Sequence, residues 1–253
     1  MSLEPLFLRS VMLLRDRIED PSVYPFSIPA VQALDGLELS AVTYFVGENG
    51  AGKSTILEAL AVASGFNPEG GSINFNFKTR RSESPLHDCI RLARPPRRPR
   101  TGFFLRAESF FNLATEIERL DAEPAPAPPV IDSYGRKSLH EQSHGESFLA
   151  LLKHRFGPNG LYILDEPEAA LSPSRQLALL ARMHDLVEDG SQFIIATHAP
   201  IVLAYPTATI YQLDDRGISS VDYEQTEHVQ LTRDFLNDRE RFLQRLLDLE
   251  AVR

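Results

Sequence analysis

The segment at residues 47–55, with the sequence GENGAGKST, constrains the fold of this chain more than any other. It fits the pattern G-x-x-x-x-G-K-[ST] of a phosphate-binding loop. An apolar run at 41–46, rich in β-branched and aromatic residues, predicts a buried strand before the loop. A helix-forming run at 55–63 follows it. Because this motif requires a strand, a loop and a helix in that order, the sequence predicts an α/β fold of the P-loop NTPase type.

The residue types in this loop suit the binding of a nucleotide. The glycines permit backbone angles that turn successive N–H groups toward phosphate oxygens, and the start of the next helix adds partial positive charge. We expect Lys53 to reach the β- and γ-phosphates of ATP and the Ser54 hydroxyl to bind Mg²⁺. The residues predicted to contact ATP here are Gly47, Asn49, Gly50, Ala51, Gly52, Lys53, Ser54 and Thr55.

Bulk composition indicates a globular protein of ordinary type, with 253 residues of which 43% are hydrophobic and 24% are charged. The single cysteine, Cys89, excludes a disulfide framework and fits a reducing compartment. No apolar run approaches the roughly 20 residues that a membrane span needs. The N-terminus does not resemble a signal peptide. We therefore expect a cytoplasmic protein without membrane insertion.

Charge is unevenly distributed along the chain. The formal net charge is −9, yet the segment that begins at Lys78 and ends at Arg106 holds nine basic residues and two acidic ones. Such a segment is a candidate contact for the phosphates of a nucleic acid. A solvated lobe that faces the acidic remainder of the chain explains the same pattern, and the sequence leaves both interpretations open.

Two further apolar runs end in polar residues. The run at 161–164 is followed by Asp165 and Glu166, and the run at 193–197 is followed by His198. Between them, residues 171–188 predict a crossover helix with Ser172 as N-cap and Pro173 at its first position. In open α/β sheets ligands bind beyond the carboxyl ends of the strands, so we expect these side chains at the nucleotide.

Each of these polar residues has a candidate role. Asp165 would hold Mg²⁺, Glu166 would act as general base on the attacking water, and His198 would reach the γ-phosphate. The plainer alternative is two solvated acids and an ordinary strand-end histidine. Earlier in the chain, Ser143 and Gly145 open a helical run, and a hydroxyl, a glycine amide and a helix start together suit an anion.

The complete set of motifs resembles the ABC-class ATPase domain over roughly residues 6–223. Lys53 and Ser54 match the Walker A motif, Asp165 and Glu166 the Walker B motif, and His198 the switch histidine. Residues 143–146 resemble the signature motif, and residues 170–173 occupy the place of the D-loop. The sequences DEPEAALSP and ATHAP are more similar to the RecF, SMC and OLD-nuclease branch and to small stand-alone ATPases than to transporter subunits.

The resemblance implies an architecture. We expect one domain over residues 1–253, with a mainly parallel central sheet, an antiparallel β edge, a small inserted basic and helical lobe at about 66–142, and a C-terminal helix at about 228–253. That helix carries an apolar stripe, which either packs on its own domain or forms a dimer contact. An aromatic residue before the phosphate loop often stacks on adenine in this class, and Tyr24 or Phe26 is the candidate. A core position is the alternative for each.

Two departures from the family pattern concern the site. His144 and Glu146 replace a glycine and a glutamine of the signature, and no clear Q-loop glutamine is present. Glu108 is the candidate for that metal or water-positioning role, although Arg106 beside it is unusual and favours a structural Arg–Glu pair instead.

The resemblance also implies how the protein works. In this class two domains enclose two ATP molecules head to tail, so Ser143 and Gly145 of one copy would complete the site of another. We therefore expect Mg²⁺-dependent ATP hydrolysis that drives a homodimer switch. The alternatives are a nucleic-acid-associated ATPase of repair or defence, a transporter nucleotide-binding subunit, and a nucleotide sensor without turnover in which Glu166 is idle.

Overall fold

The computed structural model describes residues 6–73, 84–106 and 144–247, together with the isolated positions 115, 118, 119, 121, 129, 131 and 132. Within these residues the largest element is a seven-stranded sheet with the strand order β10-β9-β3-β8-β7-β6-β4. Its strands, in that order, are Gly217–Ser220, Thr209–Asp214, Val42–Val46, Gln192–Ala196, Gly160–Asp165, Thr101–Arg106 and Gly71–Ser72.

The centre of this sheet is parallel and both of its edges are antiparallel. Strands β9, β3, β8, β7 and β6 run in one direction, whereas β10 and β4 pair antiparallel with their neighbours. Every residue of β3, β7 and β8 is buried, as expected for strands that are covered on both faces. The predicted mainly parallel α/β sheet with an antiparallel β edge is confirmed.

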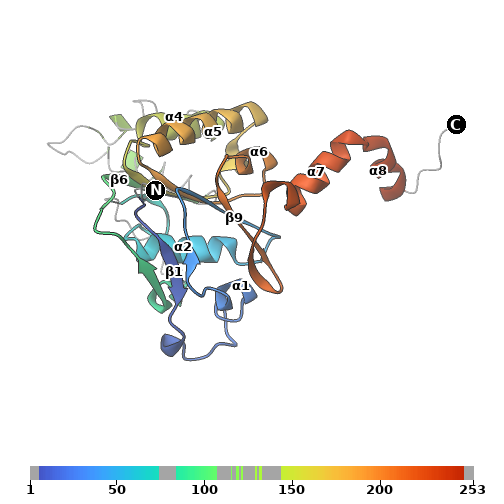
Figure 1. Ribbon diagram of the computed structural model, residues 1–253. Coiled ribbons are helices and arrows are strands. Elements are labelled where there is room, and N and C mark those ends of the chain that lie inside the picture. Colours follow the sequence, from blue (N-terminus) through green and yellow to red (C-terminus); the bar gives the residue numbers. More distant parts are fainter. Residues whose placement is uncertain are drawn as a thin grey trace.

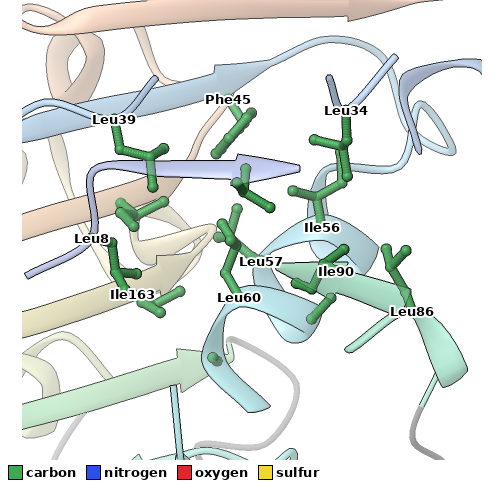
Figure 2. Close-up of a cluster of buried hydrophobic side chains, with 14 of the residues drawn as sticks. Leu8, Leu34, Leu39, Phe45, Ile56, Leu57, Leu60, Leu86, Ile90 and Ile163 are labelled. Carbon is green, nitrogen blue, oxygen red and sulfur yellow. The ribbon is translucent and has the colours of Figure 1, made fainter. Parts of the chain in front are cut away.

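A second, smaller antiparallel sheet has the order β2-β1-β5, with strands Leu37–Glu38, Ser10–Leu13 and Ile90–Ala93. The helix after the phosphate loop, α2 (Lys53–Ala63), lies between the two sheets (Figure 1). Its apolar residues Ile56, Leu57 and Leu60 are almost fully buried in a cluster with side chains of both sheets, such as Ile163 of the large sheet and Ile90 of the small one (Figure 2). Burial on both sides holds the start of α2 firmly at the end of β3.

Helices cover the other face of the large sheet. They are α4 (His144–His154), α5 (Pro173–Glu188) and α6 (Pro200–Leu203), and they bury a second core cluster that includes Phe148, Leu179 and Val202. The crossover helix begins where the sequence predicted, with Pro173 at its first turn and Ser172 as N-cap. The molecule therefore has three layers: α4 to α6, the large sheet, and α2 with the small sheet (Figure 1).

A buried glutamine links the N-terminal segment to the large sheet. The side chain of Gln192 in β8 accepts hydrogen bonds from Phe7 N and Leu8 N at 2.9 Å each, and it donates to Leu8 O and Ser40 O at 2.8 and 3.0 Å. All four hydrogen-bonding positions of the amide are used, so its full burial carries no desolvation penalty for an unpaired group.

Short helices complete the described chain: η1 (Arg15–Arg17), α1 (Pro29–Gln32), η2 (Pro85–Cys89), η5 (Pro167–Ala170) and η6 (Tyr223–Gln225). The described parts of the stretch expected to form an inserted lobe, residues 66–73 and 84–106, contribute β4, β5 and β6 to the two sheets. Most of the remainder of that stretch lies outside the described residues.

The C-terminal region forms two helices, α7 (Glu227–Asn237) and α8 (Arg239–Leu246), that project from the layered body (Figure 1). Asp238 separates them and caps α8 by accepting a hydrogen bond from Arg241 N. Val229 is the buried residue of α7, whereas Leu236 and Leu246 are 72% and 77% exposed. Leu236 and Leu246 of the apolar stripe therefore face solvent. No helix among the described residues is long and apolar enough to cross a membrane.

Candidate nucleotide-binding site

The phosphate loop joins β3 to α2, and its glycines are required by its backbone. Gly47 has φ +145°, and a Cβ at this position would lie 2.3 Å from the carbonyl oxygen of Leu213 in β9. Gly52 has φ +100° and caps α2 in the left-handed conformation. Residues with side chains resist these angles, so the loop shape predicted from the motif depends on both glycines.

The side chain of Lys53 lies along the loop. Its Nζ donates hydrogen bonds to Gly47 O at 2.7 Å and Glu48 O at 2.9 Å. Burial lowers the pKa of this ammonium, and the charges of Glu166 and Asp165 partly oppose that effect. Both of these partners are neutral carbonyl groups of the loop itself, so neither neutralises the charge of the amine.

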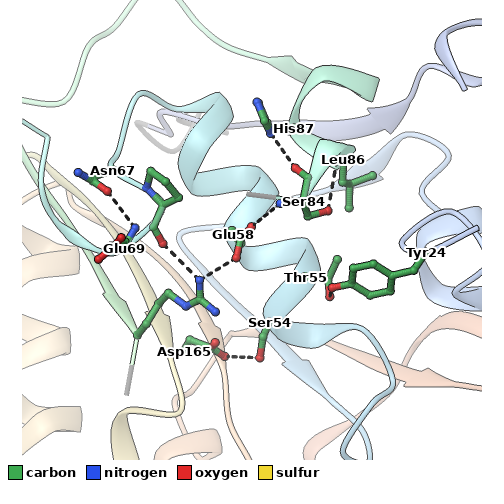
Figure 3. Close-up of polar contacts among 12 residues, drawn as sticks. Tyr24, Ser54, Thr55, Glu58, Asn67, Glu69, Ser84, Leu86, His87 and Asp165 are labelled. Atoms are coloured by element: carbon green, nitrogen blue, oxygen red, sulfur yellow. Dashed lines mark hydrogen bonds and ion pairs between the residues drawn. The ribbon is translucent and has the colours of Figure 1, made fainter. Parts of the chain in front are cut away.

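Ser54 and Asp165, the two predicted Mg²⁺ ligands of the Walker motifs, are in direct contact. Ser54 Oγ donates a hydrogen bond to Asp165 Oδ1 at 3.1 Å (Figure 3). The contact forms because β7, which ends in Asp165, lies next but one to β3 in the sheet order. Burial of Asp165 raises the pKa of its carboxyl group to about 6.

This pair suits a magnesium ion. A hydroxyl and one buried carboxylate are hard oxygen donors, and a bound cation would remove the desolvation penalty of the carboxylate. Among the residues that the structure describes, no three His, Cys, Asp or Glu side chains gather into a metal site. Mg²⁺ usually takes one or two protein ligands and completes its shell with phosphate oxygens and water.

Glu166 and His198, the predicted catalytic pair, also meet. Glu166 Oε1 lies 3.2 Å from His198 Nε2. Glu166 has φ +50° and ψ +54°, an uncommon left-handed conformation for a residue with a side chain, which is often found at functional sites. The predicted residues at the ends of β3, β7 and β8 therefore converge in one place.

Glu168 also lies at this site, although the sequence motifs assign it no role. Glu168 Oε1 accepts a hydrogen bond from the backbone N–H of His198 at 2.6 Å. Burial raises the pKa of this carboxyl group. Glu168 thus ties the loop after β8 to the end of β7. Its position two residues after Glu166 was the available sequence signal that Glu168 lies near the site. Its hydrogen-bond partner, the backbone of His198, could not be predicted because that contact depends on the fold.

The two candidate aromatic residues differ in environment. Phe26 is buried in the core, with 7% of its surface exposed, whereas Tyr24 is 65% exposed. The hydroxyl of Tyr24 lies 3.2 Å from Thr55 Oγ1 in the first turn of α2 (Figure 3). Tyr24 is therefore the aromatic side chain that remains available beside the phosphate loop.

The end of β6 holds a structural ion pair. Arg106 Nη1 lies 2.7 Å from Glu58 Oε2 in α2, and Glu58 Oε1 accepts a hydrogen bond from Ser84 N (Figure 3). The acid that pairs with Arg106 thus comes from α2, at a distance in sequence that no local pattern indicates. Glu108, the predicted third metal residue, lies outside the described residues.

The signature region is described only in part. Ser143 lies outside the described residues, while Gly145 is buried in the first turn of α4. A Cβ on Gly145 would lie 2.8 Å from Ala170 O and 2.0 Å from a guanidinium nitrogen of Arg175. The close packing of α4 on the segment after β7 therefore requires glycine here.

A histidine from the C-terminal region joins the site without any signal in the sequence. His228 in the first turn of α7 places its Nε2 2.9 Å from Nδ1 of His198, and the two rings lie 4.9 Å apart between centroids. Thirty residues separate the two positions, and no motif includes the second one.

Comparisons with known proteins agree with this site. The family model described as "AAA domain" matches residues 35–92, which contain the phosphate loop and α2. The hemin import ATP-binding protein HmuV of Nocardia farcinica is 29% identical over 185 residues, which cover 67% of this chain and 63% of that protein. A putative ribose/galactose/methyl galactoside import ATP-binding protein of Rhizobium etli is 28% identical over 203 residues, 68% of this chain and 37% of its own length.

The chain spans less than two thirds of the length of these two relatives. Among solved structures, the SMC head domain from Thermotoga maritima matches 74% of this chain and 92% of its own, with a TM-score of 0.38 and 18% identity. The motifs, their convergence at the strand ends and the family match define a P-loop nucleotide-binding protein. More narrowly, the chain is similar to ATP-binding proteins of the ABC class.

Proposed function

We propose that this chain binds ATP with Mg²⁺ and hydrolyses it to ADP and phosphate. The observation that carries the proposal is the convergence of three strand ends, with Ser54 Oγ 3.1 Å from Asp165 Oδ1 and Glu166 Oε1 3.2 Å from His198 Nε2. Phosphoryl transfer depends mainly on positioning and on neutralising charge, and this arrangement supplies groups for both.

Each residue of the site has a role in this proposed reaction. Lys53 exchanges the carbonyl groups of its own loop for phosphate oxygens, to which its ammonium binds more strongly. Glu166 takes a proton from the water that attacks the γ-phosphorus, while the bond to the β-phosphate oxygen breaks. His198 donates from Nε2 to the γ-phosphate. Bound Mg²⁺, held by Ser54 and Asp165, would neutralise charge on the phosphate oxygens.

The test is turnover and nucleotide binding measured on the same samples. We expect Glu166→Gln to bind ATP with near-normal affinity and to lose roughly 10²–10⁴-fold in turnover, the range for a general base. Lys53→Ala should lose ATP binding itself. Exposed Glu227→Gln on α7 is the matched control and should change neither. Wild-type protein that binds ATP but releases no phosphate would contradict the proposed hydrolysis and favour a nucleotide sensor without turnover.

We further propose that ATP joins two copies head to tail, with Ser143 and Gly145 of one copy at the nucleotide of the other. Support comes from the single copy of each motif in the chain and from the class that its motifs resemble. Release of the γ-phosphate would then reopen the pair. The lone Cys89 supports a cytoplasmic location for this cycle.

A second candidate function is contact with nucleic acid. Arg94, Arg97 and Arg98 line a pocket of about 290 Å³ near Ser64, at the opposite end of α2 from the phosphate loop. Ser64 Oγ is buried there without a hydrogen-bond partner among the described residues. A hydroxyl beside three guanidinium groups suits a phosphate of a nucleic-acid backbone.

This candidate predicts binding that depends on salt. Single-stranded DNA should bind the wild-type protein at low salt, and Arg98→Glu should weaken that binding and flatten its salt dependence. Arg245→Glu on α8, far from the pocket, is the charge-matched control. Equal binding by the two variants would assign the affinity to net charge and exclude this pocket.

The names of the relatives support a third candidate, an ATP-binding subunit that couples to a membrane partner. The absence of a clear Q-loop glutamine opposes it. Fractionation of the tagged protein from cells tests this third candidate. A transporter subunit would sediment with membranes and dissociate only with detergent, whereas a protein without a membrane partner would remain in the supernatant.

A further inference from the structure

The contact between His198 and His228 connects the ATP site to the C-terminal helices. His198 Nδ1 and His228 Nε2 are 2.9 Å apart, which is hydrogen-bonding distance. Both side chains are half-buried. The backbone of His198 is fixed separately, by the hydrogen bond from its N–H to Glu168. The ring of His198 is therefore oriented from one side by the end of β7 and from the other by α7.

The direction of this hydrogen bond follows from the other neighbours of His198. Burial lowers the pKa of His198 and the Lys53 ammonium acts in the same direction, while the Glu166 carboxylate opposes both; the net lowering favours the neutral ring. A neutral imidazole carries one N–H. Its Nε2 faces the Glu166 carboxylate at 3.2 Å, and a lone pair there would be repelled. The proton therefore belongs on Nε2, and Nδ1 must accept.

His228 is the group that can donate to that acceptor. A proton on its Nε2 gives a hydrogen bond from His228 Nε2–H to His198 Nδ1, and it leaves the proton of His198 on Nε2, 3.2 Å from Glu166 Oε1. A second imidazole that fixes the tautomer of the first acts as carboxylate or carbonyl partners do for other functional histidines.

We propose that His228 is a positioning residue of the ATP site, which holds His198 as the Nε2–H tautomer with its N–H directed at Glu166 and at the γ-phosphate position. The kinetic part of this inference rests on the proposed ATPase function. It also makes α7, which buries Val229 in the core, part of the machinery that senses the γ-phosphate.

The test combines two variants that keep or remove the donor. In His228→Gln the side-chain amide places an N–H at the same number of bonds from the backbone as Nε2 of histidine. In His228→Leu no donor remains. Thr232→Ala, at an exposed position of the same helix, is the control. Thermal melting checks that all variants fold.

The first readout is independent of catalysis. ¹⁵N chemical shifts of the imidazole groups in the nucleotide-free full chain, recorded where both rings are neutral, should show His198 protonated at Nε2 with Nδ1 as a hydrogen-bond acceptor. This acceptor signature should persist in His228→Gln and disappear in His228→Leu. Protonation of His198 at Nδ1, or an unchanged spectrum in His228→Leu, would overturn the proposal.

The second readout is ATP turnover. By analogy with groups that orient metal-bound histidines, we expect His228→Leu to lower kcat roughly tenfold with little change in KM, and His228→Gln to recover most of it. Equal turnover in wild type and His228→Leu would contradict the positioning role. A wild-type protein without turnover would instead refute the proposed ATPase function, and the ¹⁵N spectra would still decide the histidine pair.

Discussion

At the scale of single residues, the site depends on positions where one side chain, or the lack of one, has no substitute. A Cβ at Gly47 would meet a backbone oxygen, Asp165 is buried, and Glu166 has a left-handed backbone. The motif predicted all three from sequence, because its chemistry requires fixed residue types at fixed spacing. The structure supplies the steric reason only for Gly47; burial and a left-handed backbone are costs that the chemistry of Asp165 and Glu166 imposes on the fold.

Gly47→Ala should destabilise the protein more than Gly36→Ala. Both glycines have positive φ, so both substitutions strain the backbone, but only at Gly47 would the new Cβ meet a backbone oxygen at 2.3 Å. A Cβ at Gly36 meets nothing within 4 Å. We expect about 1 kcal/mol for Gly36→Ala, roughly 3 °C in Tm, and at least twice that for Gly47→Ala. Equal melting temperatures would contradict the close approach of the loop to β9.

Asp165→Asn should stabilise the protein in the absence of Mg²⁺ and nucleotide at high pH. The native pKa of about 6 is above the ordinary value of 3.8, so ionisation of Asp165 destabilises the fold as pH rises through 6. Denaturant titrations should show the variant more stable by about 2–3 kcal/mol at pH 8, with the difference vanishing near pH 4. A difference that is the same at both pH values would show that ionisation is not its cause.

At the scale of elements, the short segment before the phosphate loop shows a feature that sequence patterns could not predict, namely which of its aromatic side chains is buried. Residues 21–28 form turns and bends, and α1 (Pro29–Gln32) follows them. Two aromatic residues in this segment were equally good candidates for adenine stacking. Only the packing of α1 and the small sheet separates them, because it buries Phe26 and leaves Tyr24 exposed.

Tyr24→Ala should therefore change ATP affinity, whereas Phe26→Ala should change the stability of the fold. Loss of a stacking ring should weaken ATP binding by roughly tenfold, since aromatic stacking on a base contributes about 1–3 kcal/mol, with little change in Tm. Truncation of the buried Phe26 should lower stability by about 3–5 kcal/mol. Calorimetric binding and thermal melting of both variants test this pair. Unchanged ATP affinity in Tyr24→Ala would remove the tyrosine from the site.

The C-terminal helices differ in what they contribute to stability. Removal of residues 238–253 should shift Tm by less than about 2 °C, because α8 has no buried residue. Val229→Asp should lower it strongly, because it places an unpaired charge in the core. A large loss of Tm on removal of α8 would show that the helix packs on the domain in solution.

At the scale of the whole molecule, three layers hold the strand ends of the site in a fixed relation. The sheet order puts β8 between β3 and β7, so the three motif-bearing strands are adjacent although they are far apart in sequence. We retain the proposal of a single domain over residues 1–253, because β4, β5 and β6 join the same two sheets as the strands on either side of them in the chain.

Light scattering of Glu166→Gln should report twice the monomer mass only when Mg-ATP is present, because the γ-phosphate is the group that both copies would hold. Ser143→Arg in the same background should remain monomeric, and Thr232→Ala should dimerise normally. A mass that ATP does not change, with nucleotide binding confirmed, would rule out the head-to-tail switch for this chain.

The sequence by itself determined the local chemistry: the loop between β3 and α2, the acids at the end of β7, the histidine after β8 and the crossover helix between them. These follow from short-range rules of backbone angle, hydrophobic period and motif spacing, which need no knowledge of the fold. Only the tertiary structure decided which partners meet. The pairing of Arg106 with Glu58, the burial of Phe26, the anchoring of the N-terminal segment by Gln192 and the contact of His198 with His228 all join distant residues. Such contacts are set by how the layers pack, and packing is a property of the assembled chain, not of any segment in it.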